Sequence, residues 1–464
     1  MLHGGILEAY AKRELDEPLH DVSIKKDGVI LLTGHGRLLS AEDGGVAIDL
    51  YSKGKPPDRW HNFQPGEPYS LGDLPVLEAV TDYGQQVVMR GAQPSSPCHS
   101  TDAGFSRVRF HPFEVETRFD EKIEFSPSVK GIVTPFARDV SNSCSSIKDD
   151  NPMFGMAGSG RDWLNVEIDG ARAGLRKDRD GLHWFAFATK KGERSDVVKY
   201  AEAFLTALSF VVGESVSWLA CRTYSGTSEI VRLRQPGRKR KGTLNPPLPF
   251  RPFQHAETKL LANATTFFHD EANARVAHLM ELCWDALGGY CHSEYAVASI
   301  VVEALADFII EKSLAGKTPQ GIALKAETKQ LKQFKLAAVG ALRTSDKIDR
   351  EKDRRSMARV TKWIKELSIR QSPKGETIST AAGLTTTKVK ISTEEIDAWK
   401  QLRNSVTHGR FKTGATANAI ADFQKKDHQF DCCVNIINKL VLGLMGFKGE
   451  IVDYSASGYP TVTI

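Results

Sequence analysis

The periodicity of the apolar residues changes near residue 250. The chain before this point and the chain after it therefore favour two different kinds of fold. Before it, short runs rich in Val, Ile and Phe are separated by Gly, Pro, Asp and Ser, as in strands and turns. These runs include residues 22–34, 45–52, 108–119 and 123–136. After it, apolar residues recur at helical spacing. The sequence therefore predicts an α+β multidomain protein, with an antiparallel β-rich part followed by an all-α part.

Residues 1–233 are expected to form one antiparallel β-rich domain, either a sandwich or a partly open barrel. Residues 196–213 are an exception, because their apolar residues recur at helical spacing. We expect this helix to lie on or beside the sheet, and a last strand to follow at residues 228–234.

Residues 234–254 contain several prolines and a run of basic side chains, Arg238, Lys239, Arg240 and Lys241. Proline cannot extend a helix or a central strand, so this segment is expected to be a linker between domains. The basic run is suited to contact with RNA or DNA phosphates, and the alternative interpretation is a solvated loop.

Residues 255–464 are expected to form the second domain, a bundle of helices. The segments with helical periodicity are 257–287, 292–316, 321–342, 347–370, 392–409 and 415–447. The fourth segment carries Arg354, Arg355 and Arg359 among other basic residues, so it is a candidate track for an RNA backbone. Acidic residues are interspersed with them, and a solvated charged face is the alternative.

The composition fits a globular protein of a reducing compartment. The chain has 464 residues, a net charge of +5 and 41% hydrophobic residues, which permits an anionic partner without requiring one. No secretory signal and no apolar stretch long enough to cross a membrane are recognisable. The seven cysteines show neither disulfide-framework nor zinc-finger spacing. We therefore expect a cytoplasmic protein with free thiols and no bound metal or cofactor.

The segment QLRNSVTHGR, residues 401–410, lies at the end of a predicted helix. Ser392 and Glu395 form a capping-box pattern, which predicts that this helix begins directly after Ser392. Gly409 is suited to end it. The charged and polar residues of the segment would then occupy the last turns of the helix.

This helix has an apolar side and a polar side. Its apolar stripe consists of Ile396, Trp399, Leu402 and Val406. Asn404 and His408 are one turn apart on the opposite side, and Arg403 lies at the edge of the apolar stripe. An ordinary surface helix also has a polar side, so the pattern has a purely structural interpretation as well.

The residues LRNSVTHG resemble the RNxxxH signature of HEPN domains, helical bundles found in many prokaryotic defence and toxin proteins. A β-rich part ahead of such a bundle is similar to the ApeA-type HEPN proteins of phage defence. The resemblance implies that Arg403 and His408 are catalytic and that Asn404 is the polar residue that often follows the arginine. It also implies a metal-independent endoribonuclease that leaves 2′,3′-cyclic phosphate ends.

The resemblance further implies a particular assembly. In this family two HEPN domains face each other and combine their motifs in one cleft. We therefore expect a homodimer, or a larger assembly built from dimers, with Arg403 and His408 near the two-fold axis of the helical domains.

The chemistry of these residue types fits RNA cleavage without a metal. RNA supplies its own nucleophile, the 2′-hydroxyl beside the scissile phosphate. A histidine can transfer protons near neutral pH, and an arginine can stabilise the negative charge that develops on the phosphate. Since His408 falls at a helix C-terminus, where the helix dipole favours the protonated imidazole, its role as acid or base stays open.

Glu303, Asp307 and Glu311 form an acidic line on the helix predicted at 292–316. One interpretation is a solvent-facing stripe. The other is that Glu303 pairs with Arg403 across the bundle and holds it in place. HEPN domains often keep a polar or acidic residue on an early helix, so the resemblance implies a supporting role for Glu303.

Together these features predict an endoribonuclease that acts on tRNA or single-stranded RNA in anti-phage defence. The β-rich domain is expected to be a sensor or regulatory module that silences the nuclease until a phage-derived or stress trigger appears. The alternative is a non-catalytic HEPN-type module for binding or dimerisation. A third interpretation is a DNA-binding regulator that uses the basic run within residues 232–241.

Overall fold

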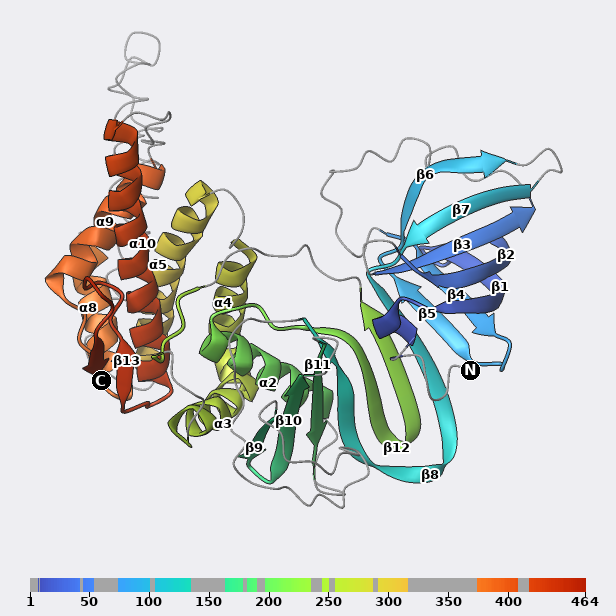
Figure 1. Ribbon diagram of the computed structural model, residues 1–464, viewed down its shortest axis with the longest axis horizontal. Coiled ribbons are helices and arrows are strands. Elements are labelled where there is room, and N and C mark those ends of the chain that lie inside the picture. Colours follow the sequence, from blue (N-terminus) through green and yellow to red (C-terminus); the bar gives the residue numbers. More distant parts are fainter. Residues whose placement is uncertain are drawn as a thin grey trace, which may run out of the picture. The chain divides into compact units, whose positions relative to one another are not determined.

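The chain forms two compact units, Met1–Ala277 and His278–Ile464 (Figure 1). The computed structural model describes residues 7, 9–41, 45–53, 74–100, 105–134, 163–177, 182–189, 197–234, 244–249, 255–286, 291–315, 374–407 and 417–464. A large antiparallel sheet lies in the first unit, and most of the helices follow it in the sequence. The predicted α+β class is therefore confirmed in these coarse terms.

In the described part of the first unit, twelve strands form one antiparallel sheet. The strands are β1 (Asp16–Lys26), β2 (Val29–Ser40), β3 (Val46–Lys53), β4 (Val76–Thr81), β5 (Gln86–Arg90), β6 (Gln93–Ser100), β7 (Phe105–His111), β8 (Glu114–Val133), β9 (Trp163–Ile168), β10 (Ala171–Lys177), β11 (His183–Ala188) and β12 (Trp218–Arg234). Their order is β6-β7-β3-β2-β1-β4-β5-β8-β11-β10-β9, with β12 on the other side of β8.

The long strand β8 joins two parts of this sheet. The first part contains β1 to β7, and the second part contains β9, β10 and β11. Its first residues pair with β5, and its last residues pair with β11. Strand β12 pairs with β8 along almost the whole length, from Arg234 opposite Glu114 to Trp218 opposite Val133. Figure 1 shows β8 and β12 as two long ribbons that curve side by side. One pair of strands therefore runs through both parts of the sheet.

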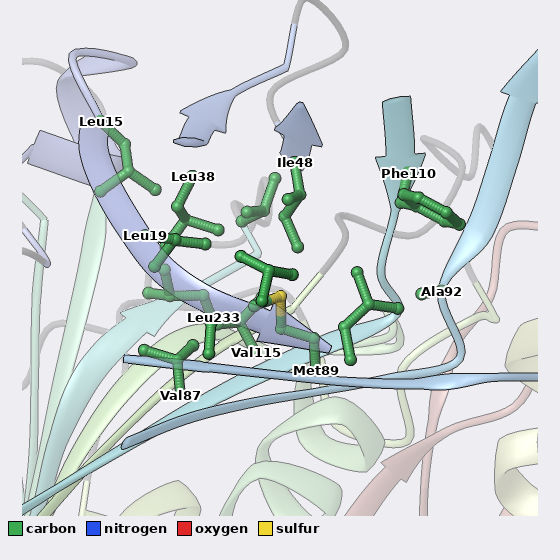
Figure 2. Close-up of a cluster of buried hydrophobic side chains, with 14 of the residues drawn as sticks. Leu15, Leu19, Leu38, Ile48, Val87, Met89, Ala92, Phe110, Val115 and Leu233 are labelled. Atoms are coloured by element: carbon green, nitrogen blue, oxygen red, sulfur yellow. The ribbon is translucent and has the colours of Figure 1, made fainter. Parts of the chain in front are cut away.

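The hydrophobic core of the first part lies on one face of the sheet. Leu38, Ile48 and Phe110 come from β2, β3 and β7 and are almost fully buried (Figure 2). Val115 and Leu233 bring β8 and β12 into the same cluster. Because side chains alternate along a strand, the residues between these point to the opposite face.

Helix α2 (Val197–Val212) contacts β8 and β11 of the second part. The ring of Tyr200 lies 5.3 Å from that of Phe187 on β11 and 4.1 Å from that of His269. Helix α3 (His255–His269) packs against α2 and β9. Asp169 accepts hydrogen bonds from the hydroxyl of Tyr200 on α2 and from that of Thr266 on α3, at 3.2 and 2.8 Å.

The helix predicted at residues 196–213 is confirmed as α2. The helical segments nevertheless begin within the first unit, because α3 belongs to it. The unit boundary falls inside α4 (Ala274–Ala286) rather than at the proline-rich segment 234–254. The predicted division into the domains 1–233 and 255–464 with a linker at 234–254 therefore differs from the division by contacts, and it stays a prediction.

Two of the segments that were predicted as single strands each contain residues of two neighbouring strands. Residues 22–34 contain the turn of the β1–β2 hairpin, where Asp27 and Gly28 have φ angles of 51° and 77°. Positive φ at both central residues is typical of a type I′ turn, which favours Asp-Gly. Likewise, residues 108–119 span the end of β7 and the start of β8. The strand predicted at 228–234 is the end of β12.

In the second unit, α4 is followed by α5 (Cys291–Ala315), α8 (Lys374–Leu384), α9 (Thr393–Thr407), α10 (Ala417–Leu444) and a hairpin of β13 (Glu450–Val452) and β14 (Thr461–Thr463). Helix α5 contacts α8, α9 and α10, and α9 contacts α10. The predicted segment 257–287 is divided, because a 3-10 helix at Glu271–Asn273, capped by Asp270, separates α3 from α4.

The helices predicted at 321–342 and 347–370 lie outside the described residues. Helix α8 was not predicted from the sequence. Of the helices that the structure does describe, none is both long enough and apolar enough for a membrane span.

We expect Phe110→Ala to lower the free energy of unfolding of the first unit by about 3–5 kcal/mol, because it removes a fully buried ring from the core. Phe113→Ala is the matched control, since Phe113 is exposed at the β7–β8 turn, and it should change this free energy by less than about 0.5 kcal/mol. Urea unfolding of both variants measures the difference. An equal loss of free energy of unfolding in Phe110→Ala and Phe113→Ala would contradict the assignment of Phe110 to the core.

Candidate active site on helix α9

Helix α9 begins with the predicted capping box. The backbone N–H of Glu395 donates to Oγ of Ser392 at 3.1 Å, and the backbone N–H of Ser392 donates to Oε2 of Glu395 at 2.7 Å. These two bonds satisfy groups that would otherwise lack a partner at the helix start. The predicted first residue of the helix, Thr393, is confirmed.

The same Glu395 side chain is fully buried and ties α9 to α10. Its Oε1 accepts from Nζ of Lys439 at 2.8 Å and from Nδ2 of Asn435 at 2.7 Å. The same amide nitrogen of Asn435 also donates to Oδ1 of Asp453 at 2.9 Å. A buried carboxylate needs this number of donors, because burial removes it from water. The network therefore fixes the start of α9 against α10 and the residues that follow β13.

The apolar stripe of α9 faces the core, as predicted. Trp399 and Leu402 are almost fully buried, and Nε1 of Trp399 donates to the backbone carbonyl of Ser299 on α5 at 2.9 Å. One turn further on both helices, Arg403 meets Glu303. Since both contacts advance by the same step along α9 and α5, the two helices run in the same direction at this point.

Arg403 and Glu303 form an ion pair, which is one of the two interpretations that the sequence left open. Nε of Arg403 donates to Oε2 of Glu303 at 2.9 Å, and each side chain is 31% exposed. The pair is therefore anchored in the bundle but still in contact with solvent. A hydrogen bond through Nε restricts the orientation of the planar guanidinium group. Because all N–H donors of the group lie in this plane, their directions are restricted as well.

The polar residues around this pair are exposed. Asn404 and Gln401 both lie on the exposed side of α9, and Oε1 of Gln401 accepts a hydrogen bond from the buried Gln429 of α10 at 2.9 Å. Asp307 and Glu311, which follow Glu303 on α5, are exposed. The acidic line thus combines both interpretations: Glu303 pairs with Arg403, while the other two face solvent.

His408 and Gly409 lie outside the described residues, which resume at residue 417. Their roles stay predictions. The basic candidates for RNA contact lie outside them as well, namely Arg238, Lys239, Arg240, Lys241, Arg354, Arg355 and Arg359. The structure therefore brings together Arg403 and Glu303, and it places Asn404 beside them on the exposed side of α9.

The described cysteines do not form a second reactive site. Cys221, Cys283, Cys432 and Cys433 are free thiols and buried. Burial raises the pKa of Cys283 and of Cys432 to about 12, so both thiols are neutral near pH 7 and are weak nucleophiles. Within the described ranges, no group of three or more His, Cys, Asp or Glu side chains is placed to hold a metal ion.

Sequence reasoning missed the partners of Glu395. Asn435 and Lys439 are polar residues inside the apolar run of α10, and this position is the signal that could have identified them as buried. Both residues donate hydrogen bonds to Glu395. They act on the candidate site through the position of the helix that carries it.

Comparison with known proteins gives no match: no family model, no curated protein and no solved structure is similar to this chain. The resemblance of LRNSVTHG to the HEPN signature therefore stays a prediction from the motif.

We expect Glu395→Gln to lower the free energy of unfolding of the second unit by about 3 kcal/mol, because Lys439 would be buried without its counter-charge. Glu394→Gln is the matched control. Glu394 is exposed in the same first turn, so both variants lose the same favourable interaction with the helix dipole. Thermal and urea unfolding measure both variants. A loss as large in Glu394→Gln would contradict the role of the buried network.

Proposed function

We propose that the protein is a metal-independent endoribonuclease of HEPN type, with Arg403, Asn404 and His408 as its catalytic residues. The observation that supports it best is the Arg403–Glu303 ion pair. An arginine whose Nε is held by a glutamate and whose side chain is 31% exposed is suited to hold a phosphate group in a fixed position. Asn404 lies next to it on the exposed side, where a substrate can reach both residues.

In the proposed reaction, the 2′-hydroxyl of RNA attacks the adjacent phosphate and the 5′-oxygen leaves, which yields a 2′,3′-cyclic phosphate. Arg403 stabilises the negative charge that develops on the phosphate oxygens. Asn404 orients the phosphate or the imidazole through its amide. His408 transfers a proton, either from the attacking hydroxyl or to the leaving oxygen. Glu303 acts as a positioning residue through Arg403.

One arginine and one histidine make a small active site. We therefore propose a homodimer, or an assembly of dimers, in which two copies of the motif share one cleft. The first unit would serve as a sensor that keeps the nuclease silent until a phage-derived trigger appears. Such control is needed because unrestrained RNA cleavage would kill the host cell.

The second candidate is a non-catalytic module for binding or dimerisation. The same ion pair supports it as well, because an arginine held by a glutamate also stabilises the contact between α5 and α9. The two candidates differ in what depends on His408, since only catalysis requires its imidazole.

We expect purified wild-type protein to cleave tRNA or a long single-stranded RNA in excess EDTA, with 2′,3′-cyclic phosphate ends. His408→Ala should abolish this cleavage. His278→Ala is the control, since the side chain of His278 is 68% exposed on α4, and it should cleave as the wild type does. Mapping of the cut ends and the rate of cleavage are the measurements.

If all three proteins are inactive in vitro, expression under phage challenge decides between the two candidates. Protection that is lost in His408→Ala supports the nuclease. Protection that persists in His408→Ala contradicts it and favours the binding module.

We expect Glu303→Gln to slow cleavage about fivefold, because a partly exposed ion pair contributes up to ~1 kcal/mol to the position of Arg403. Asp307→Asn removes a charge from the next turn of α5, where the side chain is exposed, and should leave the rate unchanged. Rates measured at saturating RNA test this. An equal loss of cleavage rate in Glu303→Gln and Asp307→Asn would contradict a specific role of Glu303, because any charge of the acidic line would then have the same effect.

A further inference from the structure

The solvent-facing side of β1, β2, β3 and β7 carries a row of rings and a guanidinium group that the proposed reaction does not use. His35 lies opposite Tyr51 in the β2–β3 pair, and Tyr51 lies opposite Arg107 in the β3–β7 pair. The ring of His20 is 6.0 Å from that of His35, and the guanidinium carbon of Arg107 is 5.8 Å from the centre of the Tyr51 ring. The row thus crosses four neighbouring strands.

These side chains point away from the core. Leu50 and Val108, the neighbours of Tyr51 and Arg107 along the strands, are fully buried on the inner face. Tyr51 itself is 43% exposed, and His20 and His35 are exposed as well. Rings on the inner face would be explained by packing, but packing does not explain this outer row.

A buried carboxylate holds the arginines of this face in place. The side chain of Asp49 is only 3% exposed, and its Oδ2 accepts from Nη2 of Arg107 at 2.6 Å. Arg109, the next outward residue of β7, donates to both oxygens of Asp49, at 2.6 and 2.8 Å. These bonds lower the pKa of Asp49, with the bond from Arg109 as the largest cause, so it remains ionised at neutral pH.

The cluster of Asp49, Arg107 and Arg109 therefore has two positive charges and one negative charge. The side chains of both arginines are more than two-fifths exposed, so their outer surfaces reach solvent. Several other charged side chains of these strands form ion pairs at the surface: Arg37 with Asp16, Lys25 with Glu78, and His20 with Asp82 when the histidine is protonated. Exposed pairs of this kind are weak and exchange readily. The excess charge of the cluster is thus positive and fixed in position.

Flat rings beside fixed cations on an open sheet match the chemistry of unpaired bases joined by phosphates. Bases stack on aromatic rings irrespective of sequence, and arginines contact the phosphates between them. A duplex cannot stack its bases in this way, because they are already stacked inside the helix.

We propose that this face binds a single strand of nucleic acid, with a base on Tyr51, the histidine rings beside it, and phosphates at Arg107 and Arg109. Stacking and phosphate contacts do not read the 2′-hydroxyl, so RNA and DNA strands bind alike. The face would give the first unit a direct contact with the RNA that the proposed nuclease cuts. The binding itself does not depend on cleavage.

The test measures binding of a fluorescent twelve-nucleotide oligouridylate, and of the matching DNA strand, to the full chain. All proteins carry His408→Ala and all buffers contain EDTA, so cleavage does not interfere. We expect Tyr51→Ala to weaken binding about tenfold. Tyr51→Phe keeps the ring and should bind within about twofold of the parent.

Tyr83→Ala is the matched control. Tyr83 is 64% exposed at the β4–β5 turn of the same unit, outside the row, and its removal should not change binding. Arg107→Gln should reduce the slope of log Kd against log salt by about 0.7, the value for one lost contact with a single strand. Unchanged thermal unfolding of the Tyr51 variants shows that their fold is intact.

Three results would overturn the proposal: equal binding by Tyr51→Ala and the parent protein, equal loss in Tyr83→Ala, or binding of a duplex as tight as that of the single strand. Failure of the parent protein to bind up to about 100 μM would overturn it too. Each of these results leaves the nuclease assay unaffected. Conversely, a wild type that does not cleave RNA leaves the binding result standing.

Discussion

The position of the candidate site depends on one buried carboxylate, that of Glu395. It closes the capping box of α9 with Ser392, and at the same time it accepts from Lys439 and Asn435 on α10. A charge that is removed from water is stabilised only by donors at close range, so each of these partners has one permitted position. The start and the tilt of α9 follow from this constraint. One turn and two turns further along, Trp399 and Arg403 then meet Ser299 and Glu303 in register.

The first unit uses the same physical device for a different purpose. Asp49 is buried in a sheet, and it holds two arginines whose outer surfaces remain exposed. In α9 the carboxylate orients a helix, whereas in β3 it orients side chains on an open surface. In both cases a buried anion holds cationic side chains in a fixed direction. At Asp49 the arginines remain exposed, and their fixed direction reduces the entropy that binding would otherwise cost.

Much of this could be predicted from local patterns. The capping box, the apolar stripe of α9 and helix α2 follow from spacing along the chain, whereas the pairing of Glu303 with Arg403 was one of two open interpretations. Other features depend on partners that are distant in sequence. Strand β12 begins ten residues before the predicted start at 228, because its Ser- and Gly-containing stretch pairs with β8 despite its weak strand propensity. Helix α8 contains two glycines and few large apolar residues, and it is stabilised by its contact with α5.

The β8–β12 pair has a consequence for cooperativity. Because side chains alternate between faces, a slip of β12 by one residue along its whole length would turn its inner residues outward in both parts of the sheet at once. Leu233 would leave the core at one end and Ala220 at the other, while Val115 and Ile132 keep their positions through the pairs of β8 with β5 and β11. A change of register in one part alone would have to be absorbed at the irregular pairing between Tyr224 and Ser228. The two parts are expected to gain and lose structure as a single folding unit, because β8 and β12 are covalently continuous through both.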